Sequence, residues 1–288
     1  LELACAYFDA HPVSVMRAAR CADVRFYSEA DAAADLIEAA IGGALGDVTS
    51  QGVPREWSAE KCPVFDPIWG RCTRAVAEAP VELLVDDDGH PQDIVSGIHE
   101  FLSARGWDPH QVMTEVACAL GTADVREVLR RGMFARHLAR FSASRRKAPI
   151  YWQLSGASGR YSVWLYVHRL TRDSLFHLQN GVVGPKLAHE ERQLASLVQS
   201  AGGSPSATER KEIAAQQAVI EELRGMLDEV KRVAPLWNPN LDDGVVLTMA
   251  PLWRLVPQCK SWQKELMAKW DELAAGKYDW ARFAMHLW

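Results

Sequence analysis

The residues of this sequence with the clearest chemical potential are cations in its middle. Residues 124–170 hold 10 Lys and Arg against 2 Asp and Glu, whereas residues 1–100 hold 7 Lys and Arg against 18 Asp and Glu. The net charge of the whole chain is only −5, but an electrostatic field acts locally. The basic segment therefore either contacts a polyanion or packs against the acidic half of the same chain. Charge alone does not choose between these interpretations.

A helical pattern predicts on which face of a helix some of these cations lie. The helical periodicity over residues 124–142 changes phase near Gly132, after which the apolar residues share one face. Arg136 and Arg140 lie on the opposite face, so we expect both to project to solvent, where arginine binds phosphate in bidentate fashion. The predicted DNA-contact residues are Arg130, Arg131, Arg136, Arg140, Arg145, Arg146, Lys147 and Arg160.

No catalytic or metal-binding constellation accompanies the cations. Asp66-Pro67-Ile68-Trp69 lacks the second proline of the D-P-P-W motif of amino-methyltransferases. Gly42-Gly43-Ala44-Leu45-Gly46 follows a helix rather than the strand that a nucleotide-binding loop requires. Asp86-Asp87-Asp88-Gly89 lacks the late Glu of a calcium loop, so we expect a solvated turn there. We predict no catalytic residue, no metal and no cofactor in this chain.

The composition is that of an ordinary globular protein. Hydrophobic residues make up 48% and charged residues 24% of the 288 residues, and no apolar run is long enough for a membrane span. The six scattered cysteines are typical of a reducing cytosol. The first residues show no secretory leader, and we expect the chain to be a cytoplasmic piece of a longer protein.

Periodicity predicts a mainly helical, α+β fold. Helical patterns run over 28–45, 91–104 and 109–120, and residues 50–92 show no clean period. Aromatic and β-branched residues on both sides of Gly156-Ala157-Ser158-Gly159 predict a small antiparallel β-hairpin at about 149–168.

Heptad spacing over 185–200 and 207–233, on either side of a Gly/Ser/Pro loop, predicts a long antiparallel, coiled-coil-like helical hairpin. Gln216 is the one polar residue at a core position of its second helix. Six Trp fall in the last 52 residues, where we expect them to form core or a subunit interface.

We predict four segments. They are an acidic helical and irregular region (1–122), a basic helix plus β-hairpin module (123–184), the antiparallel helical hairpin (185–234) and a Trp-rich C-terminal helical segment (235–288).

Several blocks resemble one family in the order in which they occur. The longest runs from Phe134 through Phe141-Ser142 and from Ser144 to Leu154. It resembles a signature of large bacterial adenine-specific DNA methyltransferases: the phage-growth-limitation or BREX (PglX-like) enzymes and their relatives in type IIG restriction and DISARM-type systems. Similar pieces are residues 84–89, 93–95, 165–171, 240–245, 262–266 and 278–281, so the resemblance covers about 82–288.

In that family the region lies near the C-terminus, downstream of the methyltransferase domain. The resemblance implies N6-adenine methylation with S-adenosylmethionine for a parent enzyme of a restriction–modification or anti-phage defence system. This chain has no N-P-P-Y-type or donor-binding motif, so no catalytic role is carried onto it. For this chain, the resemblance implies only a target-recognition or accessory region that contacts double-stranded DNA.

The alternative is a helical scaffold without DNA contact. The helical hairpin and the Trp cluster then dock the methyltransferase core or another defence-complex subunit, and the arginines bind internal carboxylates. The two functions differ in their response to salt, because binding through six or more phosphates weakens by orders of magnitude between low and physiological salt.

The isolated chain is predicted neither to bind S-adenosylmethionine nor to methylate DNA, because it lacks residues that hold the donor and a flipped base. Calorimetry with the donor and a methyl-transfer assay on duplex DNA measure both properties. Turnover by the isolated chain contradicts this prediction.

Overall fold

The computed structural model describes residues 29–45, 82–104, 106–142 and 147–287. The chain divides into two compact units. The first comprises the described residues before 143 together with 149–152 and 163–169, and the second comprises 147–148, 153–162 and 170–287. In the part that the structure describes, no helix is both long and apolar enough to cross a membrane.

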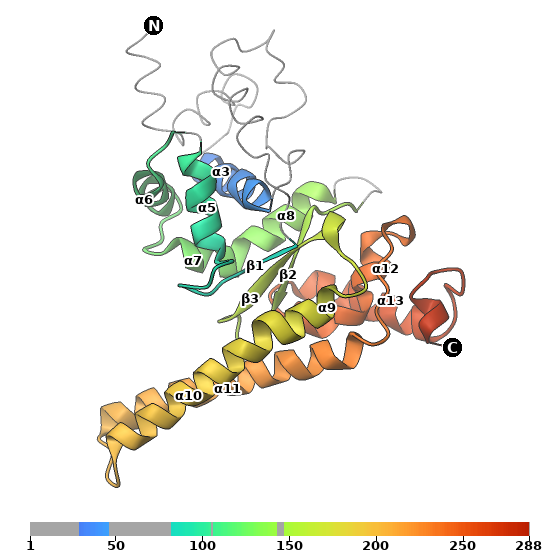
Figure 1. The fold of residues 1–288 in the computed structure, drawn as a ribbon. Coiled ribbons are helices and arrows are strands. Elements are labelled where there is room, and N and C mark those ends of the chain that lie inside the picture. Colours follow the sequence, from blue (N-terminus) through green and yellow to red (C-terminus); the bar gives the residue numbers. More distant parts are fainter. Residues whose placement is uncertain (1–28, 46–81, 105, 143–146, 288) are drawn as a thin grey trace, which may run out of the picture. The chain divides into compact units, whose positions relative to one another are not determined.

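Three helices of the first unit were predicted and are confirmed: α3 (Glu29–Ala44), α5 (Ile94–Ser103) and α6 (Pro109–Ala119) (Figure 1). Helix α3 packs against both α5 and α6. The side chain of Asp93 caps α5 and that of Asp108 caps α6, each accepting backbone N–H bonds of the first turn.

The phase change predicted near Gly132 is a π-helical turn. The run consists of α7 (Val125–Val128), a π-helix (Leu129–Met133) and α8 (Phe134–Phe141). A π turn inserts one extra residue and so rotates all later side chains about the helix axis. Phe134 and Leu138 are buried as a result.

The sheet has three strands, in the order β1 (Leu83–Val85), β3 (Ser162–Tyr166) and β2 (Tyr151–Ser155). The predicted hairpin, β2 and β3, is confirmed, and a 3₁₀ turn (Val167–Arg169) follows it. Strand β1 was not predicted, because it lies in the region without a clean period. It pairs antiparallel to β3, with Leu84 opposite Trp164.

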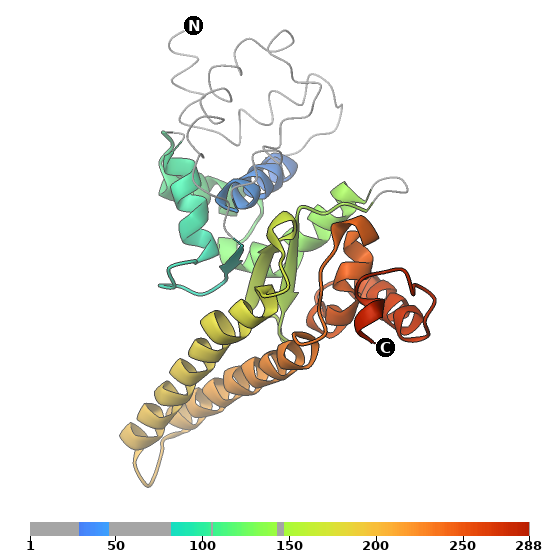
Figure 2. The ribbon, with the colours of Figure 1, turned by 45° about the vertical axis from the view of Figure 1, so that its right-hand side comes forward.

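The helical hairpin of the second unit is confirmed. A short helix α9 (Ser174–His177) and a π-helix (Leu178–Val183) lead into α10 (Gly184–Ala201), which packs along α11 (Ala207–Val233). Both views show the two helices side by side (Figures 1 and 2). Helix α11 is one continuous helix of 27 residues. Ser206 and Glu209 begin it with a capping box.

The polar exception predicted at Gln216 has a partner on the other helix. Its side-chain amide donates to the backbone oxygen of Glu190 at 3.1 Å and to the Glu190 carboxylate at 2.5 Å. Lys186 pairs with the same carboxylate at 2.8 Å. A polar contact inside an apolar seam fixes which residues of the two helices face one another.

The C-terminal segment is made of short helices and one longer one. They are a 3₁₀ turn (Leu241–Asp243), α12 (Val245–Met249), a 3₁₀ segment (Ala250–Leu255), α13 (Lys260–Ala274) and a 3₁₀ turn (Ala284–His286). Trp237 is fully buried, and its Nε1 donates to the Thr248 carbonyl at 2.8 Å. Trp280 is 60% exposed.

Gly43 allows α3 and α5 to approach closely. A Cβ at this position meets the ring of Phe101 at 1.7 Å. Gly43→Ala is therefore expected to destabilise the first unit by about 1–3 kcal/mol, the usual cost of overpacking. Gly132→Ala, where the space is open, serves as the control and is expected not to destabilise. Urea unfolding measures both, and equal midpoints contradict this account of the packing.

Candidate functional site

The basic helical run meets the acidic segment 86–93 in a cluster that we call the Arg126 cluster, made of Arg126, Arg130, Asp86 and Asp93. Arg126 Nη1 donates to Asp86 Oδ1 at 2.9 Å and to Asp93 Oδ1 at 2.7 Å, and its Nη2 donates to Asp93 Oδ2 at 2.8 Å. Arg130 Nε donates to Asp86 Oδ2 at 2.5 Å. These are charge-assisted bonds between segments more than 30 residues apart.

Burial makes the Arg126 cluster sensitive to the loss of a partner. The side chains of Asp86 and Asp93 are 0% and 1% exposed. Burial by itself raises the pKa of Asp93, but the hydrogen bonds from Arg126 and Ser96 outweigh it, and the pKa lies below its ordinary value. Burial lowers the pKa of Arg126, and the two carboxylates raise it to above its ordinary value.

The predicted solvated turn at Asp86–Gly89 is therefore wrong for Asp86. Asp88 is solvated, with 96% of its side chain exposed, but Asp86 points into the protein and holds two guanidinium groups. The sequence pattern excludes a calcium loop but carries no information on a cation 40 residues away. The described residues contain no group of three or more potential metal ligands.

A second cluster joins α8 to α3, and we call it the α3–α8 cluster: Arg136, His137 and Arg140 with Asp31, Asp35 and Glu38. Arg136 Nη2 donates to Asp35 Oδ1 at 2.8 Å. Arg140 Nη1 donates to Asp35 Oδ1 at 3.2 Å and to Glu38 Oε2 at 3.1 Å. The expectation that both arginines project freely to solvent is wrong, because α3 covers this face of α8 with its own carboxylates.

His137 lies at the centre of the α3–α8 cluster and is fully buried. Its Nε2 faces the backbone N–H groups of Ile150 and Tyr151, at 3.0 and 3.3 Å. Since Nε2 accepts there, the ring proton is assigned to Nδ1, which donates to Glu38 Oε1 at 3.0 Å. The ring also stacks on Tyr151, with centroids 3.6 Å apart. One imidazole thus connects α3, α8 and the start of β2.

Two of the other predicted DNA-contact residues, Lys147 and Arg160, belong to the second unit. In the second unit, Lys147 pairs with Glu265 and lies over the ring of Trp262. Arg160 is exposed at the turn of the β-hairpin, and its backbone N–H donates to Glu222 at 3.3 Å. Arg145, Arg146 and the side chain of Arg131 lie outside the described part of the chain.

The structure thus pairs Arg136 and Arg140 of α8 with carboxylates of α3 and places Arg130 in the Arg126 cluster. Sequence reasoning missed Arg126, which makes the largest number of short bonds in that cluster. The only signal for it was the spacing of four residues from Arg130, which places both on one helix face.

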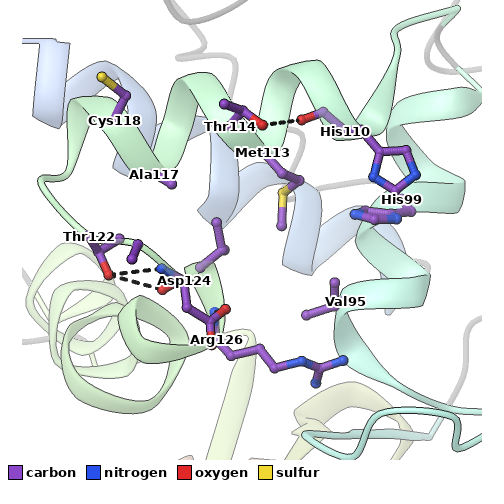
Figure 3. A pocket seen from close by; sticks show the side chains of 12 residues that line it. Val95, His99, His110, Met113, Thr114, Ala117, Cys118, Thr122, Asp124 and Arg126 are labelled. Carbon is purple, nitrogen blue, oxygen red and sulfur yellow. Dashed lines mark hydrogen bonds between the residues drawn. The ribbon is translucent and has the colours of Figure 1, made fainter.

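A pocket of about 470 Å³ lies between α5, α6 and α7 in the first unit (Figure 3). His99 and His110 meet at one end of it, with ring centroids 5.1 Å apart. Burial lowers the pKa of His99 below its ordinary value, and the neighbouring His110 acts in the same direction. Cys118 lies at the other end of α6, about 12 Å along the helix from His110. His110 therefore lies too far from Cys118 to contact its thiol.

Comparison with known proteins gives one informative similarity. No protein-family model matches the sequence. The adenine-specific methyltransferase PglX of Lacticaseibacillus casei (strain Zhang) is 26% identical to the chain over 212 residues. The match covers 68% of this chain and 17% of that relative. The chain is thus similar to a minor part of an adenine-specific methyltransferase.

Asp86 and Asp88 provide a matched test of the Arg126 cluster. Asp86→Asn is expected to destabilise the first unit by about 1.5–3 kcal/mol, because it weakens buried hydrogen bonds between charged groups. Asp88→Asn in the same segment is expected to change stability by less than about 0.5 kcal/mol, since its carboxylate is exposed. Denaturant unfolding measures both variants. If both variants change the free energy of unfolding by the same amount, the buried bonds of Asp86 do not stabilise the first unit and this account of the cluster is wrong.

Proposed function

We propose that this chain is a non-catalytic accessory region of a bacterial adenine-specific DNA methyltransferase from an anti-phage defence or restriction–modification system. The similarity to PglX over 68% of the chain supports this proposal. S-adenosylmethionine and the target adenine then bind to the methyltransferase region of the parent enzyme, because this sequence lacks the motifs for either.

Within that enzyme the chain acts first as a scaffold that docks the methyltransferase core or another subunit. One observation carries this choice. The described guanidinium groups of Arg126, Arg130, Arg136 and Arg140 all bond to carboxylates of this chain. Phosphate would have to displace partners that are already in place and desolvated, so the basic segment serves mainly to close the first unit.

Direct DNA contact is the second candidate, and a different residue favours it. Arg160 is exposed on the turn of the β-hairpin, where Glu222 Oε1 accepts from the N–H groups of Ser158 and Arg160. These bonds hold the turn on α11. A β-hairpin with an exposed Arg is suited to contact backbone phosphate or a groove edge.

Paired arginine variants separate the two functions. The double variant Arg136→Gln/Arg140→Gln is expected to lower the free energy of unfolding by about 3 kcal/mol, because it removes two cations that pair with the buried carboxylate of Asp35. Arg160→Gln is expected to change stability by less than about 0.5 kcal/mol. Urea unfolding and fluorescence anisotropy with a labelled duplex across a salt series measure stability and DNA binding in the same samples.

A scaffold is expected to show little duplex affinity even at low salt. The DNA-contact candidate replaces it if the wild-type chain binds a duplex with a steep salt dependence that Arg160→Gln lowers by about one unit of slope. If the double variant folds with normal stability and loses DNA binding, the arginines of α8 contact phosphate and the scaffold role is wrong.

A further inference from the structure

The helical hairpin is well packed at one end and open at the other. Towards the end of α11 that leads into the C-terminal segment, Leu223, Leu227 and Val230 are buried. Towards the loop that joins the helices, Leu194 is only half-buried and Val198 is 49% exposed. Two helices bury only the apolar side chains that lie between them. Apolar side chains at the border of the contact stay exposed unless another element packs on them.

A groove of about 790 Å³ runs along this open part. Leu194, Ala195 and Val198 of α10 form one wall, and Gln217 and Ile220 of α11 form the other. Its floor is therefore mainly apolar, and Ala195 leaves room for a close approach of another backbone.

The rim of the groove carries both signs of charge. Arg224 Nη2 lies 2.6 Å from Glu191 across the two helices, and Glu221 lies 3.9 Å from Arg224 on the same helix. These pairs are exposed, and exposed ion pairs exchange partners at little cost in free energy.

We propose that the occupant of this groove is a second copy of the chain, whose hairpin packs on the first to form an antiparallel four-helix bundle. Two helices side by side present a face about 20 Å wide and α10 is about 27 Å long, so a contact that starts at the groove and runs the whole of α10 buries about 1,000 Å² in the two copies together. That reaches the lower limit of a specific interface, whereas a single partner helix covers about half of it.

The charges of the rim fit this occupant. A two-fold axis makes each copy present the same patch to the other, so a self-complementary patch is required. Glu191 of α10 and Glu221 and Arg224 of α11 supply both signs of charge at the groove, as a self-complementary patch requires. Four-helix bundles cover apolar seams of this kind with short loops between the helices. The inference does not depend on the proposed methyltransferase role.

Sedimentation equilibrium of the full chain over a concentration series tests the proposal. The wild-type chain is expected to show a monomer–dimer equilibrium. Val198→Glu is expected to weaken dimerisation by at least about tenfold, because it places a charge in the apolar contact. Since Val198 is half exposed in the monomer, this variant is expected to keep the helical circular dichroism of the wild type.

Ser196→Glu is the matched control, since it adds the same charge on an exposed position of α10 outside the groove. It is expected to leave the dimerisation constant unchanged. Hydrogen exchange at high and low protein concentration then locates the contact, with slowed exchange expected in 191–199 and 217–224. A wild-type chain that stays monomeric at its highest soluble concentration overturns the proposal, and so does a dimer that Val198→Glu leaves intact.

Discussion

The first unit depends on the pairing of buried carboxylates with the cations of one helical run. Asp35, Glu38, Asp86 and Asp93 are all buried, and each would impose a large desolvation cost without a partner. The arginines and the histidine that pair with them lie between Arg126 and Arg140. Because the carboxylates come from α3 and from the 86–93 segment, satisfying them decides how both elements meet the run.

The π-helix reconciles this pairing with the apolar core. A regular α-helix from 125 to 141 would keep one phase throughout, whereas the extra residue of the π turn rotates α8 relative to α7. As a result, Phe134 packs edge-on against Trp152, with centroids 5.3 Å apart, while Arg136 and Arg140 reach α3. His137, between them, accepts the backbone bonds that begin β2. The same few residues thus join helix, helix and strand.

The helical hairpin of the second unit is held together by apolar contacts between its two helices rather than by buried ion pairs. Glu190 and Gln216 form a polar contact within it, and a contact of this kind specifies register at some cost in stability. The open end of the hairpin leaves apolar residues uncovered. A scaffold function fits such a division, in which one unit is closed by internal charges and the other offers a helical surface.

The sequence by itself determined the features that depend on local periodicity. These are the helices of the first unit, the phase change near Gly132, the β-hairpin and the continuous helix from Ala207 to Val233. Each requires only neighbours within a few residues, so the pattern of apolar positions is sufficient to predict it.

Only the tertiary structure decided where the charges go. Arg136 and Asp35 are 101 residues apart in sequence, and nothing local distinguishes an arginine that faces phosphate from one that faces a buried carboxylate. Strand β1 escaped prediction for a related reason, because a three-residue strand is defined by its partner β3 and not by its own pattern. Long-range pairing, of charges and of strands, thus determined which carboxylates the arginines of α7 and α8 face and which strand β1 joins.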